Sequence, residues 1–186
     1  MTHGMTVFLI SAAVVFALLL AVTLYYLLRM RIYQRSWDEL LARLVMVDRG
    51  GIAKVALDAI DPSGRRRRDE QARELTPEQI WNLLGGVDGV EILEKNSHVL
   101  VEIAMHLRKW YPEAAEAAEM LRRQATELGG NVENLRMADA KGHLEFHFAS
   151  YAQNATIGYY LMTQQLLELY RESKLSPRFT DLGKVI

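Results

Sequence analysis

Histidine and glutamate residues recur at helical spacing in two segments of this chain. His98, Glu102 and His106 follow one another at intervals of four residues, and His143 and His147 do the same in a second segment. Side chains at this interval lie on one face of a helix. Imidazole and carboxylate groups are ligands for zinc or iron. Two such helices packed face to face would therefore offer a metal ion five ligands.

The positions of these residues around their helices weaken the metal hypothesis. At 100° per residue, Glu102 and His98 lie about 100° and 140° from the centre of the apolar stripe, toward solvent. His106 and His147 lie at stripe edges, and His143 points further out. The Glu-x-x-His motif of carboxylate-bridged di-metal bundles is absent. A membrane-bound metal-binding helical protein is therefore the alternative function, and no cofactor is expected.

The sequence contains no motif for covalent or nucleotide-dependent catalysis. Its 186 residues include no cysteine, no Gly-x-Ser-x-Gly nucleophile elbow and no glycine-rich phosphate loop. The run from Gly85 to Gly89 is rich in glycine but lacks both a preceding strand and a lysine. We therefore predict no catalytic residue, and a binding role is favoured over an enzymatic one.

Residues 5–28 form a run of 24 residues without a single charge. As a helix this run would be roughly 36 Å long, against about 30 Å for the hydrocarbon core of a bilayer. A cleaved secretory signal fits less well, because residues 1–4 contain no lysine or arginine and the run ends without an Ala-x-Ala site. The sequence predicts a transmembrane helix over 5–28, preceded by a short extracytoplasmic N-terminus at 1–4.

Basic residues follow the apolar run directly and set its orientation. Arg29, Arg31 and Arg35 lie just after it, whereas only His3 precedes it. The positive-inside rule then places the N-terminus outside and the rest of the chain in the cytosol, at the plasma (inner) membrane. Four aromatic residues are predicted to contact the headgroups of the inner leaflet: Tyr25, Tyr26, Tyr33 and Trp37.

Charge is distributed unevenly beyond the predicted anchor. Residues 29–73 carry a net charge of +4, whereas residues 74–186 carry −5. The acidic distal part argues against nucleic-acid binding, because phosphate contacts need a basic surface. Residues 61–75 form a basic linker that contains Arg65, Arg66, Arg67 and Arg68. These four arginines either contact anionic headgroups or form a solvated loop.

Capping residues and breakers divide the remaining chain into helices. In the juxtamembrane helical segment 29–60, Ser36 is predicted to cap a helix that ends at Gly50-Gly51. The alternative is that the transmembrane helix continues through Ser36 without a break. A second short helix is predicted over 52–60. Thr76 opens the next domain, and Pro77 follows it at the first helical position.

Apolar residues at spacings of three and four predict a helical bundle over 76–174. The expected helices run from Thr76 to Gly85-Gly86, over 89–111, over 113–128 as far as Gly129-Gly130, and over 143–173, with a short helical segment at 132–140. Residues 175–186 read as a C-terminal tail. No run shows convincing strand alternation, so the predicted fold class is all-α, with a bundle of about four helices after the anchor.

The long helix over 143–173 carries polar residues within an apolar, tyrosine-rich pattern. Four polar residues interrupt the pattern, which fits a partner-facing stripe: Gln153, Asn154, Gln164 and Gln165. The favoured alternative is that Tyr151, Tyr159 and Tyr160 are core residues with their hydroxyls at the rim. The function predicted from the sequence is a membrane-tethered interaction or scaffolding module that contacts the bilayer and either a protein partner or a second copy. A third and weaker hypothesis is a sensor of the lipid surface that works through Arg65, Arg66, Arg67 and Arg68.

Overall fold

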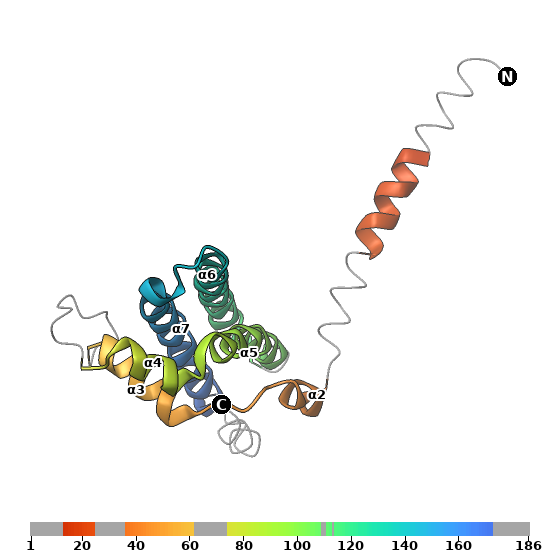
Figure 1. The fold of residues 1–186 in the computed structure, drawn as a ribbon. Coiled ribbons are helices and arrows are strands. Elements are labelled where there is room, and N and C mark those ends of the chain that lie inside the picture. Colours follow the sequence, from red (N-terminus) through yellow and green to blue (C-terminus); the bar gives the residue numbers. More distant parts are fainter. Residues whose placement is uncertain (1–12, 25–35, 62–73, 109–110, 113, 173–186) are drawn as a thin grey trace, which may run out of the picture. The chain divides into compact units, whose positions relative to one another are not determined.

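The structure of the protein is a computed structural model that describes residues 13–24, 36–61, 74–108, 111–112 and 114–172. The chain divides into two compact units, Met1–Ser36 and Trp37–Ile186, which are considered separately below. Figure 1 shows the helices of the chain in sequence colours.

Residues 13–24 form a helix whose large apolar side chains are 50–67% exposed. The hydroxyl of Thr23 donates a hydrogen bond to the carbonyl of Leu19 at 2.8 Å, so this polar group is satisfied within the helix. No helix in the described part of the chain has both the length and the apolar character that a membrane crossing requires. The other residues of the predicted span 5–28 lie outside the described residues.

Six helices make up the second unit within its described residues. They are α2 (Trp37–Ala42), α3 (Arg49–Ala59), α4 (Pro77–Leu84), α5 (Gly86–Leu107), α6 (Ala114–Ala140) and α7 (Leu144–Glu172). The all-α prediction is confirmed, and the described part of the range 76–174 holds four helices, α4, α5, α6 and α7, as predicted for the bundle. The short helices α2 and α3 pack on this bundle (Figure 1).

The long helices alternate in direction. Arg136, near the end of α6, forms ion pairs with Glu91 and Glu94 near the start of α5, so these two helices run antiparallel. The turn at residues 141–143 reverses the chain between α6 and α7. Helices α5 and α7 therefore run parallel, and Asn96 on α5 lies beside Tyr159 on α7.

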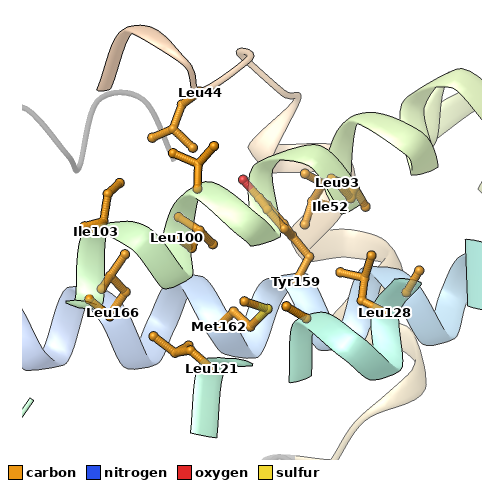
Figure 2. Close-up of a cluster of buried hydrophobic side chains, with 14 of the residues drawn as sticks. Leu44, Ile52, Leu93, Leu100, Ile103, Leu121, Leu128, Tyr159, Met162 and Leu166 are labelled. Carbon is orange, nitrogen blue, oxygen red and sulfur yellow. The ribbon is translucent and has the colours of Figure 1, made fainter. Parts of the chain in front are cut away.

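One apolar core joins all six helices of this unit. Figure 2 shows Tyr159 reaching from α7 toward α5 between Leu93 and Leu100, while Met162 and Leu166 of α7 lie near Leu121 of α6. The Tyr159 ring is almost fully buried, and this burial raises the pKa of its hydroxyl, while the hydrogen bond from Asn96 acts in the opposite direction. The tyrosine is therefore part of the core and not of a partner-facing stripe.

The predicted helix end at Gly50-Gly51 was wrong. Helix α2 does begin directly after Ser36, but it ends at Ala42, and the two glycines lie in the first turn of α3. Asp48 caps this turn, because its carboxylate accepts a hydrogen bond from the backbone N–H of Gly50 at 3.0 Å. A Cβ at Gly51 would lie 2.7 Å from the backbone oxygen of Leu83, so a glycine is needed there for close packing.

The predicted helix end at Gly129-Gly130 was also wrong. Helix α6 runs through both glycines to Ala140, because Leu128, Val132 and Leu135 keep the apolar stripe continuous and are all buried. A glycine inside a helix costs about 1 kcal/mol relative to alanine. Burial of each large apolar side chain contributes about 1.5–3 kcal/mol, which outweighs that cost.

The helical domain starts at Trp37 and includes most of the segment predicted to be juxtamembrane. Trp37 is only 7% exposed, and its ring lies 5.1 Å from that of Tyr170 and 6.3 Å from that of His106. It is therefore a core residue of the domain, and our placement of Trp37 among lipid headgroups was wrong. The sequence alone does not distinguish a tryptophan that contacts lipid headgroups from one that is buried in a protein core next to a membrane anchor.

The side chain of Asn96 holds the extended segment between α2 and α3 against α5. Its amide oxygen accepts a hydrogen bond from the backbone N–H of Val45 at 2.9 Å, and its amide nitrogen donates to the backbone carbonyl of the same residue at 2.8 Å. The amide nitrogen also lies 3.4 Å from the hydroxyl of Tyr159. One buried amide thereby satisfies two backbone groups of a segment that lies outside any helix.

We expect Asn96→Ala to lower the free energy of unfolding by about 2–3 kcal/mol, because it removes two backbone partners from a partly buried segment. The matched control is Asn131→Ala, since the amide of Asn131 bonds only to the carbonyl of Glu127 in its own helix and this bond is exposed. That control should change stability by less than about 0.5 kcal/mol. Urea denaturation of the full-length chain measures both, and equal effects would contradict the role given to Asn96.

Candidate binding site

The structure does not bring the five predicted metal ligands together. Within the described part of the chain, which includes all five, no three His, Asp or Glu side chains are placed to hold a metal ion. His98, His143 and His147 are exposed, and His106 is half-buried beside Trp37. Glu102 forms an ion pair with Arg43.

The parallel arrangement of α5 and α7 explains why the ligands stay apart. His106 lies ten residues beyond Asn96, whereas His147 lies twelve residues before Tyr159, the neighbour of Asn96. At about 1.5 Å per residue, the two histidines are roughly 30 Å apart along the bundle. The face-to-face packing that the metal hypothesis required is therefore contradicted by the register of the two helices.

A cavity of about 720 Å³ lies between α4 and the first turn of α7. This volume is within the usual range for a ligand pocket. Seven described residues line it: Pro77, Glu78, Trp81, Asn82, Leu144, Glu145 and Phe148. Aromatic and aliphatic side chains form part of its wall, and the charged side chains in this set are both carboxylates.

A capping box fixes the start of α4 and thus its side of the cavity. The hydroxyl of Thr76 accepts a hydrogen bond from the N–H of Gln79 at 3.3 Å, and the amide oxygen of Gln79 accepts one from the N–H of Thr76 at 2.9 Å. Ile80 and Leu84 then point into the core. Because they take the buried side of this short helix, Trp81 stands on the side that lines the cavity.

A glycine turn fixes the start of α7 on the opposite side. Gly142 adopts φ +72°, and the N–H of His143 donates to the carbonyl of Ala138 at 2.9 Å, which closes the end of α6. Helix α7 begins at Leu144 immediately after this turn. The start of α7 contacts α4, and Leu144 and Glu145 of its first turn line the cavity together with Phe148 of its second.

Trp81 is the accessible aromatic ring of the cavity. Its ring centroid lies 4.4 Å from that of Phe148 at an interplanar angle of 52°. Phe148 is 3% exposed and Trp81 is 41% exposed, so the phenylalanine supports the indole from the core. Gly86, at φ +71°, packs under the indole, where a Cβ would lie 2.9 Å from a ring carbon. The ring is thus held in place while much of its surface stays open.

Two exposed carboxylates give the cavity a negative charge. Neither Glu78 nor Glu145 forms an ion pair with any described residue, whereas Glu91, Glu94 and Glu102 are all paired with arginines. Both unpaired glutamates lie in the first turn of a helix, where the helix dipole contributes roughly half a positive charge per terminus. Two carboxylates against two such partial charges leave a net charge of about −1.

A smaller cavity of about 300 Å³ adjoins α4 on another side. Asn82 lines both cavities, and the smaller one is otherwise lined mainly by aliphatic and glycine residues, among them Met46, Ile52, Leu83 and Leu93. The surface around Asn82 therefore combines an acidic aromatic hollow with an apolar one.

The other predicted surface residues lie outside the described residues. These are Arg29, Arg31, Arg35, Arg65, Arg66, Arg67, Arg68, Tyr25, Tyr26 and Tyr33. Their predicted contacts with lipid stay predictions, as does the C-terminal tail at 175–186.

The sequence did not indicate this cavity, because Trp81, Leu144 and Phe148 fit the apolar spacing that predicts the bundle over 76–174. One available signal was the width of the apolar face of α4. In this eight-residue helix, Ile80, Leu83 and Leu84 already occupy the side that packs on the core, so Trp81 lies outside that side. A search against family models, curated proteins and solved structures finds no match to this chain.

We expect Gly86→Ala to displace the Trp81 indole, because the added Cβ would overlap the ring. The matched control is Gly85→Ala, which has a similar φ of +76° but no atom within 4 Å of the added Cβ. Both changes should cost about 1–2 kcal/mol through backbone strain. In protein labelled with 5-fluorotryptophan, only Gly86→Ala should shift the ¹⁹F resonance of Trp81, assigned with Trp81→Phe. Equal shifts in both variants would contradict this packing.

Proposed function

We propose that this protein is a membrane-tethered interaction module: residues 5–28 anchor it in the plasma (inner) membrane with the N-terminus outside, and the helical domain in the cytosol binds a protein partner. The observation that carries the binding role is the cavity around Trp81. A 41% exposed indole costs free energy in water, and a partner that covers it recovers that free energy.

The anchor is supported by the apolar helix at 13–24. Eight of its side chains are large, apolar and 50–67% exposed: Val14, Val15, Phe16, Leu18, Leu19, Leu20, Val22 and Leu24. Apolar surface of this extent is stable in contact with lipid and not in contact with water. The uncharged run extends beyond this helix on both sides, to a length that matches a bilayer.

Tethering gives the binding role its physical advantage. Confinement to one membrane face makes encounters with other membrane-bound proteins effectively intramolecular, so even a weak site can be occupied. A single cavity with an exposed aromatic ring and a polar rim is the kind of site that such confinement makes useful.

We expect the full-length protein to sediment with membranes, to resist extraction at alkaline pH and to dissolve in detergent. Replacing Leu18 and Leu19 by arginine (Leu18→Arg with Leu19→Arg) should release it, because each charge at a helix centre costs about 2.5–3.5 kcal/mol in a bilayer. The control pair Leu18→Ile with Leu19→Ile should stay in the membrane fraction. Recovery of the unaltered chain in the supernatant would refute the anchor.

We expect a photocrosslinking amino acid, p-benzoylphenylalanine, placed at position Asn82 to give a discrete adduct in intact membranes. Asn82 is exposed and lines both cavities, so a bound partner would lie next to it. The control position is Glu127, which is exposed on α6. Mass spectrometry of the adduct distinguishes a second copy of the chain from another protein. Equal labelling from both positions, or none from either, would refute the interaction role.

A further inference from the structure

We infer that the cavity between α4 and α7 receives a basic side chain of the partner protein, which stacks on Trp81 between Glu78 and Glu145. This inference rests on the proposed interaction role and specifies the chemistry of its partner. It follows from three properties of the cavity: an indole that is 41% exposed, two carboxylates without an ion pair and a lining that supplies no cation among the described residues.

The indole favours a cation over a neutral group. The face of a tryptophan carries negative charge, and a guanidinium or ammonium group within about 6 Å of the ring centroid is attracted to it. Phe148 and Gly86 hold the Trp81 ring from below, so little side-chain freedom is lost when a ligand stacks on it.

The carboxylates strengthen this preference and exclude an anion. Two helix N-termini meet at the cavity, and alone they would attract an anion. In α4, however, few terminal donors are left for an anion, because Pro77 has no N–H and the N–H of Gln79 already donates to the hydroxyl of Thr76. With Glu78 and Glu145 added, the net charge of about −1 selects a positive group.

An apolar neighbour of the basic residue fits the same surface. The smaller cavity lies beside Asn82, and its lining includes the partly buried Leu83 and the 80% exposed Met46 together with Asp48. The partner segment is therefore a basic stretch that also carries aliphatic side chains, in contrast to a uniformly charged one.

The test uses two fluorescein-labelled peptides with the sequence Leu-X-Leu-X-Leu-X, where X is arginine in one and citrulline in the other. Citrulline has nearly the shape of arginine but no charge. With the full-length chain in neutral detergent micelles, fluorescence anisotropy should show that the arginine peptide binds about tenfold more tightly than the citrulline peptide. Empty micelles give the background for each peptide.

Two double variants locate the effect. Glu78→Gln with Glu145→Gln should remove most of the preference for arginine, and Glu116→Gln with Glu127→Gln, which neutralises two exposed glutamates of α6, should leave it unchanged. All four side chains are exposed, so both variants should fold, and circular dichroism verifies this.

The outcomes separate this inference from the proposed function. Equal affinity for both peptides, no binding of either, or equal losses in both double variants would overturn the preference for a basic side chain. A crosslinked adduct at position Asn82 would preserve the interaction role in each of these cases. Without such an adduct, the interaction role fails as well.

Discussion

The burial of α7 is the constraint on which the rest of the helical domain depends. This helix contacts α3, α4, α5 and α6, and twelve of its residues are buried. Its register against α5 is set by Tyr159, whose ring enters the core (Figure 2). The hydroxyl of Tyr159 lies beside Asn96 of α5. A slip of one residue would rotate the apolar face by about 100° and expose it, so this register is strongly favoured.

The position of every candidate site residue follows from that register. With Tyr159 beside Asn96, the first turn of α7 lies opposite α4, and Phe148 supports Trp81. The same register leaves His147 far from His106, so the packing that forms the aromatic cavity also keeps these two predicted ligands apart. The core, and not the spacing of the histidines, decides which side chains meet.

Local signals in the sequence predicted the helices well where a cap and an apolar stripe agree. Thr76 and Pro77 mark the start of α4, and the start of α7 lies one residue from its predicted position. The glycine pairs at 50–51 and 129–130 misled the prediction, because a glycine that ends a helix and one that allows close packing are identical in sequence. Only the neighbours, the backbone oxygen of Leu83 near Gly51 and the buried side chains after Gly130, distinguish the two cases.

The candidate site was harder to predict, because its residues are separated by more than sixty positions in sequence. Glu78 and Glu145 are ordinary first-turn glutamates when each helix is considered alone. Their shared role arises only when two helix starts pack together, and that packing is decided by the burial of Ile80, Leu84 and Phe148. Sequence periodicity identifies these as core residues without indicating which helices meet.

The two proposals together, a cavity that receives a basic side chain and an anchor in the membrane, have a consequence for the partner. A basic segment is attracted to anionic lipid by about 1 kcal/mol per residue, so lipid competes with the cavity for the same charge. An exposed surface carboxylate contributes no more than this, because it is screened by water and salt. The difference in binding free energy between the cavity and lipid comes from the aromatic ring, because a basic side chain can stack on Trp81 but not on a lipid headgroup. Selection of a protein partner over lipid therefore depends more on Trp81 than on the two glutamates.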